Sequence, residues 1–214
     1  MIRNSNENAS RLAQSIENLA TRIVNEKLKN EVRTTVPGYI LSFDPVKQRA
    51  SVQVGVEKLL ISGESVSPPP IIQCPVCIYG ASGGAIEVEV SKGDECLIHF
   101  SMRCIDGWRE QGGIAPLVRI ERFRESDAFV VLAPRSSANA ITSYSNDGIK
   151  IRSKDGSNYV WVKSNGEVEI NGAKVTSSGN VITAAGTDLD AFKAEYDLHT
   201  HSHGDPSGTT STPL

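Results

Sequence analysis

The stretch between residues 140 and 186 consists of very short apolar runs separated by glycine turns, and it constrains the fold more than any other feature. The glycines are Gly148, Gly156, Gly166, Gly172, Gly179 and Gly186. They predict short strands at 149–151, 159–162, 167–170, 173–175 and 180–182. Strands of this length cannot build a core of their own, and they would leave an unpaired edge. Their apolar side chains therefore need a partner face from elsewhere.

Two folds can supply that face. One is a β-helix, in which stacked turns close the core. A single chain offers too few turns for this, so three intertwined chains would have to provide the missing walls. The other is an ordinary β-meander packed on the rest of the chain. The pattern favours a short trimeric β-helix over residues 137–187, with the meander as the alternative.

The N-terminal segment, residues 1–34, carries a helical pattern. Its apolar positions are Ala9, Leu12, Ile16, Leu19 and Ile23. The spacings of three, four, three and four residues give an a/d heptad stripe flanked by charged residues. A lone helix of this length is marginal in water. We therefore expect an amphipathic helix that packs either on its own domain or on copies of itself.

Residues 35–136 read as a small closed β-barrel, which makes the chain predominantly all-β. A Pro37-Gly38 pair opens the segment, and alternating valines in 49–56 indicate a half-buried strand. Five or six short strands with no strong helix between them are typical of such a barrel. The expected strands are 39–43, 49–56, 76–79, 85–90, 95–100 and 128–132.

The four cysteines do not form a convincing metal motif. Cys74 and Cys77 have the spacing of half a zinc knuckle, but Cys96 and Cys104 lie eight residues apart and do not complete it. The favoured interpretation is that they are small buried apolar side chains on strands.

Three of the four histidines alternate near the C-terminus, in the segment 188–214. His199, His201 and His203 would project to one side of an extended strand. Imidazole is a ligand for zinc, copper, iron and nickel. Two histidines from each of three chains would place six nitrogens around one axial ion, which is a saturated and therefore structural site. We predict one transition-metal ion per trimer, and a disordered histidine-rich tail is the alternative.

Charge and hydropathy narrow the class of protein. The net charge of −3 argues against a nucleic-acid partner. No apolar run reaches the length of a membrane span, and the polar start of the chain lacks the apolar region of a signal peptide. We therefore expect synthesis in a cytoplasm.

Several motifs resemble the barrel domain of the baseplate central spike, or membrane-piercing, proteins of contractile-tailed phages. They occur in the family's order and are Pro75-Val76, residues 90–100 with a Gly-Asp-Glu turn, Cys104-Ile-Asp-Gly-Trp108, Gly112-Gly113 and residues 125–130 with Ser-Asp-Ala. The His-Thr-His sequence and the small polar tail after it resemble spike tips. Two features depart from the family pattern: Arg122-Phe-Arg124 replaces an expected basic-His element, and His203 extends the His-x-His pair.

The resemblance implies a homotrimer with an oligosaccharide/oligonucleotide-binding (OB) barrel, a β-helix and an iron-holding tip. The metal ligands carried over are His199 and His201, with His203 as second choice, and zinc remains possible in place of iron. It also implies assembly in the bacterial host cytoplasm and a place at the tail baseplate tip of a virion. A hub or tube protein would be the partner, and the bacterial outer membrane would be the target.

These observations predict a non-enzymatic piercing spike. Two other functions stay open. A tail-tip zinc-dependent cell-wall hydrolase could use the three histidines, but the sequence lacks a His-Glu-x-x-His pattern or a Gly-x-Ser-x-Gly elbow. A glycan-binding OB module would use the barrel, but aromatic residues make up only 6% of the chain.

Overall fold

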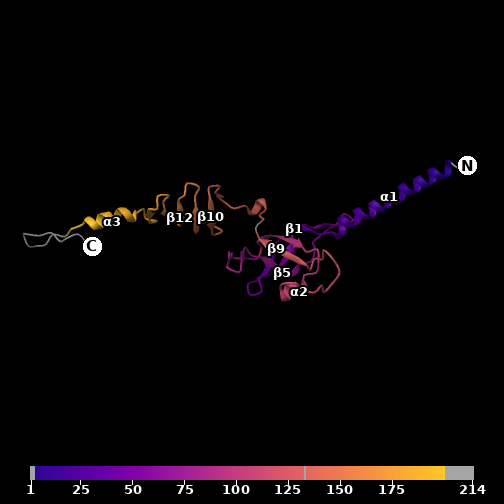
Figure 1. The fold of residues 1–214 in the computed structure, drawn as a ribbon, viewed down its shortest axis with the longest axis horizontal. Helices are drawn as coiled ribbons and strands as arrows, with labels where there is room; N and C mark the ends of the chain where they lie inside the picture. The colour runs from indigo at the N-terminus through magenta and orange to yellow at the C-terminus, as the bar shows by residue number, and fades with distance from the viewer. Residues whose placement is uncertain (1–2, 133, 201–214) are drawn as a thin grey trace, which may run out of the picture. The chain divides into compact units, whose positions relative to one another are not determined.

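The computed structural model describes residues 3–132 and 134–200, and the side chains among them except at 3–7 and 29–31. The chain divides into two compact units, Met1–Asn139 and Ala140–Leu214, and each is described by itself. Figure 1 follows the chain from the N-terminal helix through a β-barrel to a second small sheet and a short helix.

The first element is α1, a helix of 29 residues from Arg3 to Glu31 (Figure 1). Every described side chain in it, from Asn8 to Leu28, is exposed to solvent. The N-terminal helix predicted from the heptad stripe is therefore confirmed. No other element in the described part of the chain covers the apolar stripe of α1.

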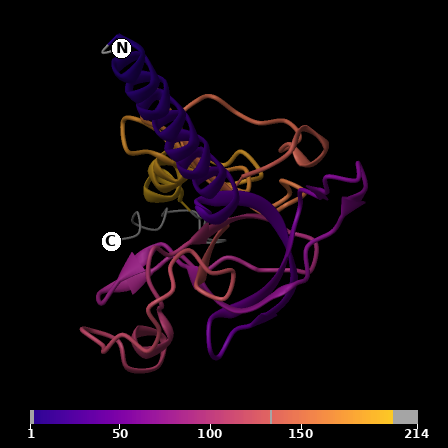
Figure 2. The same ribbon diagram turned by 90° about the vertical axis from the view of Figure 1, so that its right-hand side faces the viewer.

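Five strands close into the barrel that the sequence predicted. They are β1 (Thr35–Asp44), β2 (Arg49–Val54), β5 (Ile71–Cys77), β8 (Glu95–Phe100) and β9 (Ala128–Leu132). Their order around the barrel is β1-β2-β5-β9-β8, and β8 pairs with β1 to close it. All neighbours run antiparallel except β5 and β9, which run parallel. Figure 2 shows the strongly curved strands that enclose this OB-like barrel.

The barrel core comes from alternate residues on these strands. The alternation is clearest in β2, where Ala50 and Val52 are buried, and in β8, where Cys96 and Ile98 are buried. Ile98 is fully buried, and burial of such a side chain stabilises a fold by roughly 1.5–3 kcal/mol. The cluster is Ile40, Ala50, Val52, Ile71, Cys74, Val76, Cys96, Ile98, Ala128 and Val130.

Smaller elements decorate the barrel. Two short hairpins pair β3 (Lys58–Leu59) with β4 (Ser65–Val66), and β6 (Gly80–Ala81) with β7 (Gly84–Ala85). A helix that the sequence did not predict, α2, spans Asp106–Gln111, and a 3-10 turn, η1, spans Ser137–Asn139.

The strand predicted at 85–90 is wrong, since only Ala85 belongs to a strand. Its apolar residues Ile86 and Val88 are each 61% exposed. The alternation there has the period of a strand, but no neighbouring strand of the described chain pairs with it.

The second unit is an antiparallel meander of five strands followed by a helix. The strands are β10 (Ile149–Arg152), β11 (Tyr159–Val162), β12 (Val168–Ile170), β13 (Ala173–Val175) and β14 (Val181–Ile182). Gly148, with a φ of 70°, sits where an added Cβ would lie 2.0 Å from the carbonyl oxygen of Val162. Each strand pairs with the next one along the chain, so the connectivity within one chain is that of a meander. A trimeric β-helix remains a proposal.

The helix α3 spans Leu189–Leu198. The side chain of Asp188 caps it by accepting hydrogen bonds from the backbone N–H groups of Asp190 and Ala191, at 2.9 and 3.2 Å. Among the described helices, none combines the length and the apolar character that a membrane span needs.

Candidate functional site

The five-stranded sheet of the second unit has two unlike faces, which its register defines. Ile149 pairs with Val162, and Ile151 pairs with Val160. Directly opposed residues of an antiparallel pair point to the same side of a sheet. The register continues this side across the later strands, so the apolar sheet face consists of Ile149, Ile151, Val160, Val162, Val168, Ile170, Val175 and Val181.

The apolar sheet face is uncovered in a single chain. Ile149 is 71% exposed and Ile151 is 65% exposed. Val160, Val162, Ile170, Val175 and Val181 each keep between 41% and 53% of their surface exposed. Contiguous apolar surfaces of this kind mark interaction sites. The sequence predicted these residues as a face in need of a partner, and the structure brings them together on one side.

The opposite face of the sheet satisfies its own polar groups. The Lys163 ammonium group forms ion pairs with the carboxylates of Glu167 and Glu169. The hydroxyl of Tyr159 donates a hydrogen bond of 2.5 Å to Glu169. These two donors lower the pKa of Glu169, the ammonium of Lys163 being the larger cause. This face therefore suits contact with water.

Cations also cover the aromatic rings of this polar face. The Lys150 Nζ lies 4.2 Å from the ring centroid of Tyr159 and 4.4 Å from that of Trp161. Nζ of Lys163 lies 4.8 Å from the Trp161 ring centroid. The indole N–H of Trp161 donates to the carbonyl oxygen of Asp147 at 2.5 Å. The rings thus belong to a ladder of side chains on the polar face of the sheet.

His199 follows directly after helix α3, whose apolar residues Leu189, Phe192 and Tyr196 are exposed. The His199 ring centroid lies 4.7 Å from that of Tyr196. Its Nδ1 contacts the carbonyl oxygen of Tyr196. A ring that donates from Nδ1 to a carbonyl carries its lone pair on Nε2, which is the arrangement of many metal-binding histidines.

The other two predicted ligands, His201 and His203, lie outside the described residues. The backbone of His199 is extended, with φ −71° and ψ 142°. An extended chain is the conformation in which alternate side chains share a side. The pair formed with His201 extends beyond the described residues, so the ligand assignment stays a prediction.

Two of the four cysteines are small side chains in the barrel core. All four are free thiols, and Cys74 and Cys96 are buried on β5 and β8. Burial raises the pKa of each of these two thiols to about 11. They stay protonated at neutral pH, whereas a zinc ligand must be a thiolate. The interpretation as buried strand residues holds for these two, while Cys77 is exposed.

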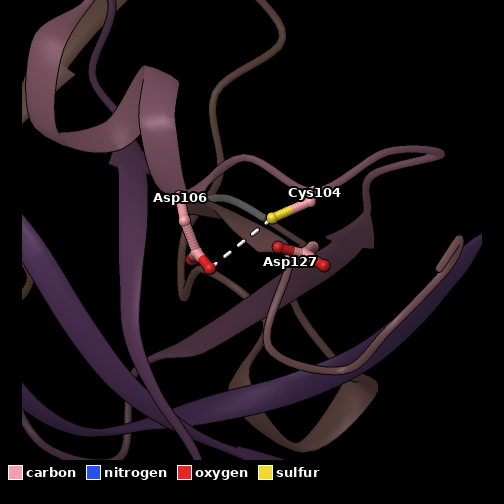
Figure 3. A group of neighbouring side chains, drawn as sticks. All are labelled: Cys104, Asp106 and Asp127. Atoms are coloured by element: carbon pink, nitrogen blue, oxygen red, sulfur yellow. Dashed lines mark hydrogen bonds between the residues drawn. The ribbon is translucent and has the colours of Figure 1, made fainter. Parts of the chain in front are cut away.

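A cluster of polar side chains lies at the side of the barrel, where α2 begins. Figure 3 shows Cys104, Asp106 and Asp127 converging there, and one ligand atom from each lies within 4.8 Å of the others. The Cys104 thiol donates to Oδ2 of Asp106 at 3.5 Å. Asp127 is fully buried, and its Oδ1 accepts the backbone N–H of Ile105 at 3.1 Å.

Two arginines neutralise this cluster. The Nη2 atom of Arg119 lies 2.8 Å from Asp106 Oδ2 and 3.3 Å from Asp127 Oδ1, and Arg109 pairs with Asp106 as well. Guanidinium groups therefore already supply the positive charge that a metal ion would bring. We read the cluster as a structural clasp for the loop between β8 and β9. The sequence analysis did not find the arginine partners of these aspartates, because neither arginine belongs to a recognisable motif.

The comparison with known families matches the barrel. Residues 36–133 match the family model described as the phage protein Gp138 N-terminal domain. The barrel is therefore similar to the Gp138 N-terminal domain. Gp138 is a phage baseplate spike protein family, which confirms the resemblance seen in the motifs. The match ends at the barrel, so the sheet, α3 and the histidines lie outside it. No curated protein matches the chain.

The match to the Gp138 model supports a role for this chain as a component of a phage tail or baseplate spike. The match contains all five barrel strands except the first residue of β1, together with the clasp formed by Asp106, Arg119 and Asp127. A barrel of this kind does not fix an activity by itself, because function resides in sites carried on a fold.

Proposed function

We propose that this chain is the central spike at the tip of a contractile phage-type tail, and that it pierces the host outer membrane mechanically as a homotrimer. The Gp138 barrel supports the baseplate part of this proposal. The single observation that carries the rest is the exposed apolar sheet face of the second unit. No catalytic residue is required by such a mechanism.

Three copies of the sheet can cover one another's apolar faces around a common axis. Removing apolar surface from water stabilises an assembly by roughly 25 cal/mol per Å². The polar faces, with Lys163 paired to Glu167 and Glu169, would then lie outward. This orientation gives a trimeric prism or β-helix with a dry interior and a solvated surface. In this arrangement the apolar sheet face is buried and the polar face contacts water, so three-fold closure suits both faces of the sheet.

The tip follows from the same symmetry. His199 and His201 of three chains would surround one axial transition-metal ion with six nitrogens, with His203 as the second choice of ligand. Such a site has no open position for substrate, so its role is to hold the three chains together. Iron is the ion that the family resemblance implies, and zinc is the alternative.

The proposed action is a transfer of force. Sheath contraction drives the tube forward, and the spike leads it. A hub or tube protein is the proposed partner on the virion side, and no nucleic acid is involved. The rigid trimer would concentrate the load on a narrow, metal-bound end that parts the outer membrane. A meander alone, with its apolar sheet face in water, would be too weak for this.

The assembly can be tested by placing a charge on the apolar sheet face. Val175 is 41% exposed in one chain, so Val175→Lys would be tolerated by a monomer. In the proposed trimer the lysine would be buried and unpaired, and the trimer should dissociate. Ser177→Lys, in the exposed turn after the same strand, adds the same charge as a matched control.

Light scattering on both purified variants gives the answer. We expect a trimer for Ser177→Lys and a monomer or a much weaker trimer for Val175→Lys. Equal, undiminished trimers from both variants would show that this face is not the interface. A wild-type chain that stays monomeric would reject the proposed function.

A further inference from the structure

The apolar stripe of α1 has no cover within the described chain. Its residues Leu12, Ile16, Leu19 and Ile23 are between 50% and 62% exposed. With Ala9 they occupy successive a and d positions, with Ala9, Ile16 and Ile23 at a and Leu12 and Leu19 at d. We call these five residues the α1 seam. The helix has 29 residues, and none of its described side chains is buried.

A helix in this state requires a partner. Isolated helices are marginal in water, and most of their stability in proteins comes from packing of an apolar face. A seam with an a/d repeat, which here runs from Ala9 to Ile23, is complementary to another helix with the same repeat, through knobs-into-holes packing. Further copies of α1 meet that condition.

The C-terminal end of α1 is anchored to the barrel by contacts of the residues that follow it. Arg33 forms an ion pair with Glu125 at 3.3 Å and donates to the carbonyl oxygen of Phe123 at 3.2 Å. The next residue, Thr34, accepts the backbone N–H of Phe100 at 2.9 Å. The chain is thus anchored two residues after α1 ends at Glu31. Barrels that share an axis would therefore hold three α1 helices at a high effective concentration.

The charges of α1 favour copies of itself over a lipid surface. Between Asn8 and Leu28 the basic residues are Arg11, Arg22 and Lys27, and the acidic residues are Glu17 and Glu26, which gives a net charge of +1. A helix that lies on a membrane usually carries a strongly basic polar face and aromatic residues on its apolar face. This stretch of α1 has neither, and its near-neutral charge leaves little repulsion between copies.

We infer that α1 forms a parallel three-stranded coiled coil with the α1 helices of two other copies, an inference that rests on the proposed trimer. Cyclic symmetry orients all copies the same way, which makes the coil parallel. Isoleucine at a with leucine at d favours two strands in a free dimer. Ala13 and Ala20, at the e positions beside the α1 seam, widen the apolar strip so that it can contact two neighbours. The chain would then be joined at both ends.

Disulfide trapping tests the contact in the full-length chain. Ile16→Cys places a thiol in the α1 seam, where equivalent a positions of neighbouring helices meet. Gln14→Cys places it on the outer f position as the matched control. Both variants are made with the exposed Cys77 changed to serine, and their mass is measured by light scattering before oxidation.

We expect trimers in which Ile16→Cys forms covalent dimers at least about tenfold faster than Gln14→Cys on mild oxidation. Trimers that cross-link equally slowly at both positions would overturn the coiled coil and leave the proposed spike intact; a seam reserved for a hub or tube protein would give this result. Monomers without cross-links would overturn both proposals. A protein that has the mass of a dimer before oxidation, and that cross-links quickly through Ile16→Cys, would support self-association of α1 and reject the trimeric spike.

Discussion

The guanidinium of Arg119 bridges two carboxylates, and one of them, that of Asp127, is completely shielded from water. Its Nη2 lies 3.3 Å from Asp127 Oδ1 and 2.8 Å from Asp106 Oδ2. The same Asp127 oxygen accepts the N–H of Ile105. The Asp127 side chain thereby ties the start of β9 to the start of α2, through Ile105, and to the loop that precedes β9, through Arg119. We regard this clasp as a determinant of barrel stability.

Removing the Asp127 carboxylate should destabilise the barrel. Asp127→Ala leaves the buried N–H of Ile105 without its acceptor, and such a loss costs about 1–3 kcal/mol. Asp127→Asn keeps an acceptor and should cost less. Urea unfolding measures this in a Trp161→Phe background, where Trp108 reports on the barrel because its ring centroid lies 5.5 Å from that of Phe129. Glu121→Ala, at an exposed ion pair with Arg124, is the control and should shift the free energy of unfolding by less than about 0.5 kcal/mol.

The buried thiols predict a loss of barrel stability at alkaline pH. The pKa of Cys74 and Cys96 rises from 9.0 to about 11 on folding because burial disfavours the thiolate. The unfolded chain therefore loses protons first, and the stabilisation is complete below pH 9 and declines between about pH 9 and 11. The slope of the free energy of unfolding against pH should flatten in a Cys74→Ala, Cys96→Ala double variant. An unchanged slope would count against burial as the cause.

Acid should weaken the second unit through Glu169. Its folded pKa lies below the usual 4.5 because Lys163 and Tyr159 donate hydrogen bonds to the carboxylate. The resulting stability is present above pH 4.5 and is lost as pH falls through the lowered folded pKa. In a Trp108→Phe background, Trp161 fluorescence should show a thermal midpoint that falls below pH 4.5. Glu169→Gln should remove part of that fall, because the pKa values of Asp147, Asp155 and Asp188 in the same unit are lowered as well. The exposed Glu87→Gln serves as control, and it should behave as the parent does.

Metal content should depend on the tip histidines alone. The double change His199→Ala, His201→Ala should abolish the bound ion, which elemental analysis of the purified chain detects. His99→Ala is the matched control, because His99 lies on β8 with its Nδ1 2.8 Å from Thr35 Oγ1. Retention of the ion in the double variant would contradict the ligand assignment, and loss in a His203→Ala variant would shift it toward that residue.

Much of the fold was predictable because its signals are local. Glycine turns such as the one at Gly148 delimit β10 to β14, and alternation within each strand identifies the apolar sheet face. The heptad stripe likewise locates α1. Alternation failed at 85–90, because the period of a strand does not reveal whether a neighbouring strand exists.

The parts that resisted prediction depend on contacts formed only after folding. Arg119 sits in a loop without a periodic pattern, and nothing in its surroundings marks it as the partner of Asp106 and Asp127. The fit of such a residue is decided by the path of the loop between β8 and β9. For the tip, sequence spacing suggests the His-x-His pair, and the structure adds the extended backbone and ring contact at His199.

Native mass spectrometry of the full-length protein counts the chains that share the apolar sheet face. We expect a dominant species of three times the 23.0 kDa chain mass, carrying one transition-metal ion. A dominant species with the mass of one chain and no metal, at concentrations where the protein is folded, would contradict the proposed trimer.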